Sequence, residues 1–244
     1  TSDEINQIRG VIDNDFTVQY MNDTGAQLDN KKGNQMNGMK CYDHFKTKDC
    51  RTSNCACSKT MSTGQGTSRE TQANPGDKNL EIAYSAVPLK DREGSLIGAF
   101  EVVTDQTTAV NAIKKAEKVN NYQIIEANKL TEALGKFANG DLSFTLETEK
   151  SDSDTEKAKE ILDSINSAVN QTADKVRSLI EDANMLSQAA VEGKLKTRAD
   201  AEKHQGDFRK IVEGVNDTLD AVIGPLNVAA DYISKISLGN MPEL

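Results

Sequence analysis

The chain has 244 residues, a formal charge of −9 at pH 7 and a mean hydropathy of −0.59. Only 36% of its residues are hydrophobic and 5% are aromatic, a composition too polar for one large globular core and typical of long, solvated helices beside a small core. The acidic charge argues against nucleic-acid binding, which needs clustered Lys and Arg, and no apolar run is long enough to span a membrane.

Residues 1–104 predict a small α+β domain, because short apolar runs alternate there with Gly, Pro, Asp and Asn. We expect two strands, then short helices, then three strands. The predicted strands are 8–12, 17–21, 66–71, 80–88 and 96–104. The turn from Asp91 to Gly94 joins the last two strands in a hairpin, and short turns favour antiparallel neighbours. The expected result is an antiparallel sheet.

All four cysteines of the chain are clustered in this region. They are Cys41, Cys50, Cys55 and Cys57. Four thiolates are a ligand set for a tetrahedral metal ion or an iron–sulfur cluster, although the Cys-x-Cys spacing is tighter than zinc sites usually have. Free thiols are the ordinary state in a reducing compartment, and disulfides are a third alternative. The sequence therefore predicts a local site and leaves these three alternatives open.

A haem group is not expected. It would depend on His44, which lies beside Tyr42 and Phe45, and a lone His in such a place is more often packed than ligating. The chain also lacks a Cys-x-x-Cys-His motif. The second histidine, His204, lies in a polar segment, where we expect it to be solvated or to cap a helix.

From residue 105 onward the composition predicts helices. No Pro interrupts the stretch from Asp105 to Ala138, which would form a helix about 50 Å long. Such a helix with a modest apolar face needs a partner helix to be stable. Asp105 or Thr107 is expected to accept hydrogen bonds from the free amides at its beginning.

An internal repeat is the most informative feature of these helices. Each complete copy has a helix end followed by Gly, one polar residue and Leu, at Gly140-Asp141-Leu142 and at Gly193-Lys194-Leu195. A hydrophobic residue followed by Asn comes later in each copy, at Ile165-Asn166 and at Val215-Asn216. A third copy, cut off by the end of the sequence, is Ile236-Ser237-Leu238-Gly239-Asn240-Met241.

The apolar residues of the second helix in each copy predict a coiled coil. They step by three and four residues, with one doubled step of four that predicts local unwinding of the supercoil. We expect the two helices of a copy to run parallel, with a long connector between them. Apolar connector residues would hold it in the groove, namely Leu142, Phe144 and Leu146 in the first copy, or Leu195 and Ala199 in the second. Two chains would then form a parallel four-helix bundle. Antiparallel hairpins are the alternative, but the connectors are long for such turns.

The repeat resembles the HAMP domain of bacterial and archaeal receptors. The resemblance lies in Gly-x-Leu between amphipathic helices and in Asp207, which stands nine residues before Asn216. Pro225 fits the Pro that often occurs in the first HAMP helix, whereas the first copy departs with Lys157 at the acidic position. The stretch 193–239 resembles the tandem HAMP modules of methyl-accepting chemotaxis proteins.

The N-terminal region resembles a PAS domain. The segments that carry this resemblance are Tyr20-Met21-Asn22, 38–42 and 87–91 with Gly94. The closing Asp105-Gln106-Thr107 is similar to the Asp-x-Thr motif that links a PAS sheet to its signalling helix.

These resemblances imply an α+β PAS-like domain followed by all-α parallel four-helix coiled-coil HAMP units in a dimer. The implied divisions are 1–104 for the PAS domain, 105–121 for the signalling helix, 122–175 and 176–224 for two HAMP units, and 225–244 for the start of a third. The residues expected to relay a signal are Asp105, Thr107, Gly140, Leu142, Asn166, Gly193, Leu195, Asp207, Asn216 and Pro225.

The implied function is the cytoplasmic sensory and transmission part of a chemoreceptor. It would act as a homodimer on an output domain outside this chain and, through that domain, on a histidine kinase and its adaptor. The sequence starts at Thr1, so we expect a fragment, and any membrane anchor would lie outside it. The sequence identifies neither the signal nor a ligand.

Two alternatives remain. The chain could serve a sensor histidine kinase, or it could be a redox or metal-binding domain with a coiled-coil dimerisation tail. We expect no enzymatic activity in the chain itself, because it has no nucleophile elbow, phosphate-binding loop or zinc-protease motif.

Overall fold

The computed structural model describes residues 7–239, which fall into two compact units, Thr1–Glu117 and Lys118–Leu244. The first unit holds a β-sheet flanked by short helices. The second consists of long helices and the connectors between them. Residues 240–244, the end of the predicted third unit, lie outside the described residues.

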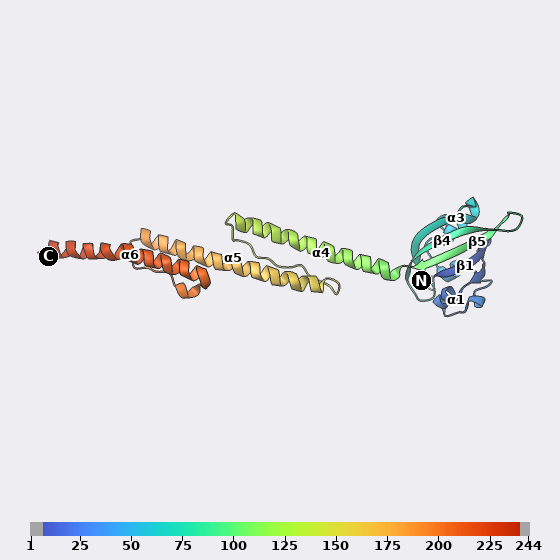
Figure 1. Ribbon diagram of the computed structural model, residues 1–244, viewed down its shortest axis with the longest axis horizontal. Helices are drawn as coiled ribbons and strands as arrows, with labels where there is room; N and C mark the ends of the chain where they lie inside the picture. Colours follow the sequence, from blue (N-terminus) through green and yellow to red (C-terminus); the bar gives the residue numbers. More distant parts are fainter. Residues whose placement is uncertain (1–6, 240–244) are drawn as a thin grey trace. The chain divides into compact units, whose positions relative to one another are not determined.

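The first unit is built on a five-stranded antiparallel sheet in the order β2-β1-β5-β4-β3 (Figure 1). The strands are β1 (Ile8–Asp13), β2 (Val18–Met21), β3 (Thr67–Ala73), β4 (Leu80–Lys90) and β5 (Leu96–Asp105). Asp91 closes the turn between β4 and β5, where its side chain accepts hydrogen bonds from the amides of Glu93 and Ser95. The predicted antiparallel sheet is confirmed.

Short helices cover the buried face of this sheet. They are α1 (Asp23–Ala26), α2 (Cys41–Phe45) and α3 (Ala56–Thr63), with 3-10 turns at Gln27–Asp29 and Gly33–Gln35. The helix α3 packs on β3, β4 and β5, and α1 packs on β1. Alternate residues of a strand point to the same face, so Ala99, Glu101 and Val103 of β5 are buried together beneath these helices.

The second unit contains most of α4 (Thr107–Ala138), then α5 (Glu156–Val191) and α6 (Gly206–Ser237). Residues 139–155, the first connector, join α4 to α5, and residues 192–205, the second connector, join α5 to α6. The second connector includes a 3-10 turn at Ala201–Lys203. None of the helices within the described residues is long and apolar enough to cross a membrane.

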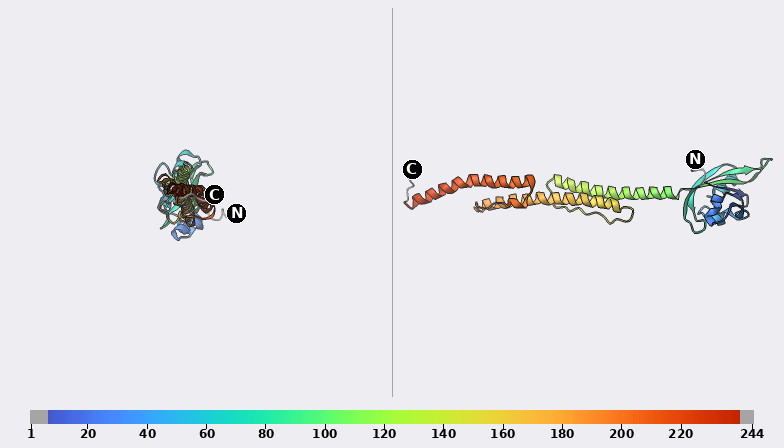
Figure 2. Two further views of the ribbon diagram at one scale, coloured as in Figure 1. Left: turned by 90° about the vertical axis from the view of Figure 1, so that its left-hand side faces the viewer. Right: turned by 60° about the horizontal axis from the view of Figure 1, so that its bottom comes forward.

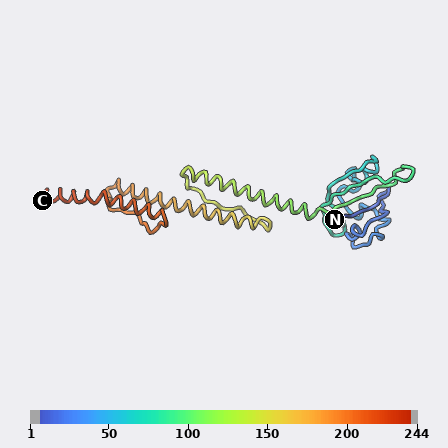
Figure 3. Tube along the Cα trace, in the orientation of Figure 1, coloured from blue at the N-terminus to red at the C-terminus, as the bar shows by residue number. Residues whose placement is uncertain are grey.

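Each connector runs back along the helices that it joins (Figures 1 and 3). In the first connector, later residues contact earlier positions of each helix, and earlier residues contact positions further along it. The contacting pairs are Tyr122–Glu149 and Phe137–Phe144 on α4, and Asp163–Thr148 and Arg177–Leu142 on α5. The two helices therefore run parallel, as the sequence predicts, and not as an antiparallel hairpin. Figure 2 shows the same course in a second view.

Glycine ends the leading helix of each repeat. Gly140 and Gly193 have φ angles of 78° and 75°, a left-handed conformation that glycine adopts without steric cost. The residue after each glycine donates its amide back into the helix, Asp141 to the Lys136 carbonyl at 2.9 Å and Lys194 to the Ala189 carbonyl at 2.8 Å. This pattern satisfies carbonyls that a helix end leaves free and turns the chain into the connector.

Candidate functional site

The junction between the sheet and α4 is fixed by the predicted Asp105-Gln106-Thr107 motif. The Asp105 carboxylate accepts hydrogen bonds from the amide and the hydroxyl of Thr107. The Thr107 hydroxyl oxygen in turn accepts from the amide of Glu81 on β4 at 2.9 Å, and the Gln106 amide donates to the Glu81 carbonyl at 2.8 Å. The beginning of α4 is therefore tied to both central-hairpin strands, β4 and β5.

Glu81 also contacts α4 about two helical turns beyond Thr107, at Lys114. Its carboxylate pairs with Lys114 at 2.8 Å and accepts from the Gln72 amide group at 3.1 Å. The hydrogen bond from Lys114 holds the pKa of Glu81 below its ordinary value. Because both groups are solvated, this pair contributes little stability and serves mainly to orient the helix.

The four predicted cysteines meet at one small cavity in the core of the first unit, which we call the cysteine cavity. Its volume is about 20 Å³, and it lies between α2, α3, the loop before α3 and the sheet. The lining residues are Cys41, Phe45, Thr47, Cys50, Cys55, Cys57, Ile82, Tyr84, Glu101 and Val103. All four cysteines are free thiols. A cavity of this size holds about one water molecule, far less than an organic ligand needs.

The four thiols have different surroundings. Cys41 and Cys57 are buried, whereas Cys50 and Cys55 are partly exposed. The Cys57 thiol lies 3.3 Å from Oε1 of Glu101. Cys55 is the residue that precedes the first turn of α3. The cavity thus combines one partly exposed thiol at a helix N-terminus with a buried thiol two residues further along the chain.

Burial and these contacts shift the pKa values of the cavity groups in opposite directions. The neighbouring Cys57 thiol, with the first amides of α3, lowers the pKa of Cys55 to about 6. The neighbouring Cys55 thiol and burial raise the pKa of Cys57, and burial raises that of Cys41. Burial also raises the pKa of the Glu101 carboxyl to about 7.

The metal site predicted at the cysteines stays a prediction. Within residues 7–239, no three His, Cys, Asp or Glu side chains are arranged to hold a metal ion. His44 is fully buried but does not line the cysteine cavity. Its Nδ1 lies 2.7 Å from the Asp29 carboxylate and its ring packs edge-on against Phe45. This environment is that of a packed histidine.

Each connector is held by an asparagine of the following helix. Asn216 of α6 accepts from the Ala199 amide at 3.1 Å and donates to the Ala199 carbonyl at 2.9 Å. In the first connector the same pair of bonds joins Leu146 to Asn170, at 2.9 and 3.0 Å. The sequence comparison paired Asn216 with Asn166, which is buried one turn earlier in α5. The longer first connector displaces the equivalent position to Asn170.

The remaining predicted relay residues do not form a connector clamp. The Leu142 carbonyl accepts a hydrogen bond from Arg177, whereas the Leu195 side chain is 40% exposed. Asp207 is exposed in the first turn of α6 and pairs with Lys210 at 2.8 Å. Pro225 lies inside α6, which continues through it. His204, expected to be solvated, is instead buried, with Nε2 2.6 Å from the Asp182 carboxylate.

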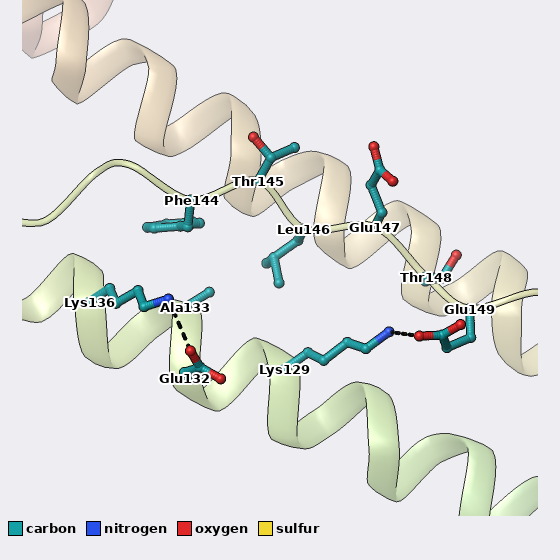
Figure 4. Close-up of a pocket in the computed structure, with 10 residues that line it drawn as sticks. All are labelled: Lys129, Glu132, Ala133, Lys136, Phe144, Thr145, Leu146, Glu147, Thr148 and Glu149. Atoms are coloured by element: carbon teal, nitrogen blue, oxygen red, sulfur yellow. Dashed lines mark hydrogen bonds and ion pairs between the residues drawn. The ribbon is translucent and has the colours of Figure 1, made fainter.

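A groove between α4 and the first connector is shown in Figure 4. It is about 520 Å³ in volume, and its walls are charged side chains of α4 and the connector segment 144–149. Lys129 pairs with Glu149 across it at 2.7 Å, and Lys136 pairs with Glu132 at 2.9 Å. Phe144 and Leu146 point from the connector toward α4 (Figure 4). The groove therefore serves to fix the connector on its helix.

Comparison with protein families gives two matches. Residues 2–111 match the PAS fold, and residues 203–244 match the HAMP domain. The first unit has the PAS fold. The HAMP match covers α6 and the residues that follow it, and it does not include the first repeat. No curated protein matches the chain.

Solved structures similar to the PAS domain share little sequence with it. The PAS domain of a Colwellia psychrerythraea protein is 17% identical, covers 43% of this chain and 91% of its own, and gives a TM-score of 0.38. A sensory box sensor histidine kinase from Vibrio cholerae is 12% identical, with coverages of 42% and 84% and a TM-score of 0.36. The PAS domain of Bordetella pertussis BvgS is 12% identical, with coverages of 49% and 90% and a TM-score of 0.34.

Two residues of these sites were not among the predicted ones, although the sequence carried a signal for each. Glu101 is an acidic residue in phase with Ala99 and Val103, and such a position on a strand points into the core. Val169-Asn170 is a second hydrophobic-Asn pair, four residues after Ile165-Asn166. Connector contacts were needed to choose between the two registers.

Proposed function

We propose that this chain is the sensory and signal-transmission part of a dimeric chemoreceptor. A PAS domain together with a HAMP domain forms a signal-transduction sensory module. In this proposal the PAS domain receives the signal and α4 carries it into tandem HAMP units, the first of which is the repeat held by Asn170. The observation that carries the proposal is the identical connector clamp in both repeats, at Leu146–Asn170 and Ala199–Asn216.

The apolar seam predicted along α5 and α6 supports the proposed homodimer. In a single chain these side chains are exposed: Ile161 is 63% exposed, Val215 43% and Ile233 69%. A groove of about 280 Å³ between α5 and α6 is lined almost wholly by apolar residues, among them Leu179 and Ile211. A second parallel copy would cover this seam, and each large apolar side chain buried there contributes roughly 1.5–3 kcal/mol.

The relay would act through two packings of this seam. Parallel helix bundles can adopt alternative arrangements that differ by a few kcal/mol, so a small change at the start of α4 is enough to shift the balance. Hydrogen bonds of Asp105 and Thr107 connect the beginning of that helix directly to β4 and β5 of the PAS sheet. The output domain and, through it, a histidine kinase and adaptor would respond in the cytoplasm.

Disulfide crosslinking tests the dimer. In a background with the four native cysteines replaced by serine, Ile165→Cys and Val215→Cys should each give symmetric dimers under mild oxidation. Ser167→Cys and Asp217→Cys are matched controls two residues away, on other faces of the same exposed helices, and should crosslink much less. Circular dichroism checks that each variant is folded. Equal crosslinking at seam and control positions would contradict the proposed register.

Sedimentation of the unsubstituted chain gives an independent readout. A dimer at micromolar concentration is expected, with a sedimentation coefficient that does not change on further dilution within that range. A compact monomer throughout the micromolar range would overturn the proposal, whatever the crosslinking variants show.

The same PAS and HAMP order also fits a sensor histidine kinase, which is the second candidate. The domain attached to this module in the full-length protein separates the two. A long helical hairpin supports the chemoreceptor, and an ATP-binding kinase domain supports the alternative. A metal- or redox-active domain with a dimerisation tail is the third candidate, and the following inference bears on its chemistry.

A further inference from the structure

The cysteine cavity has an arrangement that the PAS fold itself does not require. Four thiols from α2, α3 and the intervening loop converge on a space of about 20 Å³, and they are all reduced. Cys55 is partly exposed, whereas Cys57, which lines the same cavity two residues further along the chain, is only 1% exposed. One thiol can therefore meet a small solute from outside while its neighbour is shielded from it.

The surroundings of Cys55 favour a reactive sulfur. It stands at the N-terminus of α3, where the first backbone amides of the helix favour negative charge. Cys50, the other partly exposed thiol, is instead engaged by the amide and hydroxyl of Thr47 at 3.3 and 3.1 Å. Cys55 is thus the accessible thiol that is free to react.

The lining of the cavity disfavours a metal ion. Four thiolates with a divalent ion carry a net charge of −2, and Glu101 lies buried beside them. None of the residues that line the cavity in the described part of the chain is basic. A buried excess of negative charge without a cationic partner is costly. Conversion of two thiols to a disulfide adds no charge.

We propose that Cys55 is the site at which a hydroperoxide oxidises the PAS domain, and that the product condenses with a second thiol of the cysteine cavity. In the first step the Cys55 sulfur attacks one peroxide oxygen, the O–O bond breaks, and a sulfenic acid and an alcohol or water form. In the second step a neighbouring thiol displaces the sulfenic hydroxyl as water and an S–S bond forms. Two electrons pass from the two sulfurs to the hydroperoxide.

Cys57 is the expected second thiol. Cys57 lines the same small cavity as Cys55, and Oε1 of Glu101 lies 3.3 Å from the Cys57 sulfur to receive its proton, which then leaves with the departing water. Oxidation would thereby remove the hydrogen bond from Cys57 to Glu101 on β5. This strand ends at Asp105, the residue that holds Thr107 at the start of α4. The step from oxidation to output rests on the proposed function, but the oxidation itself does not.

Mass spectrometry of the full chain tests the site. The reduced chain is treated with hydrogen peroxide, alkylated and cleaved after Lys and Arg, which places Cys41 and Cys50 on separate peptides and Cys55 with Cys57 on residues 52–59. The expected product is peptide 52–59 with two hydrogen atoms fewer. Cys57→Ser should instead give a sulfenic acid at Cys55 that dimedone traps. In Cys55→Ser, hydrogen peroxide should oxidise the remaining thiols at least about tenfold more slowly than in the unsubstituted chain. Cys50→Ser is the matched control and should be oxidised at the same rate as the unsubstituted chain.

Each other outcome decides the proposal. A disulfide from Cys55 to Cys41 or Cys50 supports the site and replaces Cys57 as the partner. Oxidation that leaves Cys55 open to alkylation, or an unchanged rate in Cys55→Ser, overturns it. So does about one zinc per chain in protein purified without chelator, with the thiols protected from alkylation, because this would favour the metal site. A monomeric chain in which Cys55 still oxidises would reject the dimeric relay alone.

Discussion

Replacing Asn170 by Ala removes both hydrogen bonds that hold Leu146 in the first connector. Leu146 is only 8% exposed, so its backbone N–H and C=O would be left buried without their hydrogen-bond partners. At about 1 kcal/mol for each hydrogen bond, the local stability of the connector should fall by roughly 2 kcal/mol. Since 1.4 kcal/mol corresponds to a factor of ten, the Leu146 amide should exchange its hydrogen about 30-fold faster.

Hydrogen–deuterium exchange of the first connector measures this effect directly. Gln171→Ala is the matched control, because Gln171 is the next residue of α5, is exposed and bonds only within its own helix, to Ser167. The control should leave the exchange of residues 139–155 unchanged. Equal exchange in the Asn170 and Gln171 variants would contradict the clamp. If only Asn166→Ala made the amides of the first connector exchange faster, the result would support the register expected from the sequence.

Three further perturbations address the other contacts. Burial raises the pKa of Glu101 from 4.5 to about 7, so the folded state binds this proton more tightly and PAS stability should fall by about 3 kcal/mol as the pH rises from about 4.5 to above 7. Glu101→Gln should abolish that fall in urea unfolding at pH 5 and 8. Gly140→Ala should destabilise the second unit by about 1 kcal/mol, because the backbone of Gly140 is left-handed. Gly135→Ala inside α4 should instead stabilise the second unit by about 0.5–1 kcal/mol, because alanine favours a helix more than glycine does. Thermal melts measure both changes. Thr107→Val removes the acceptor of the Glu81 amide and should speed exchange of that amide by roughly fivefold to tenfold.

The strands could be predicted from the sequence because burial of one sheet face imposes a period of two. Ile82, Tyr84 and Ala86 of β4 follow this period and are all buried. The antiparallel order also followed from short turns such as the one at Asp91. The period of a strand and the turn between two strands depend only on residues that are close in the sequence. Both can therefore be predicted from a single sequence.

The cysteine cavity depends on contacts that no local rule contains. The spacing of Cys55 and Cys57 predicts that they lie close together, but Glu101 reaches them only because β5 is placed at the centre of the sheet. The spacing also could not separate a metal site from free thiols, since that choice depends on burial and on the charge around the sulfurs. The expectation for His204 failed in the same way, because Asp182 belongs to the preceding helix.

The connector clamps bear on how such a module would transmit a change. Asn170 and Asn216 bind the backbone of the connector and leave the side chains of the apolar seam free. Each clamp therefore holds a connector on the helix that follows it without fixing how that helix packs on a second copy. In the proposed dimer the contacts within a chain are directional hydrogen bonds, whereas those between chains are apolar and non-directional. A rotation of α4 would then move a helix pair as one body, and the seam would repack at a cost of a few kcal/mol.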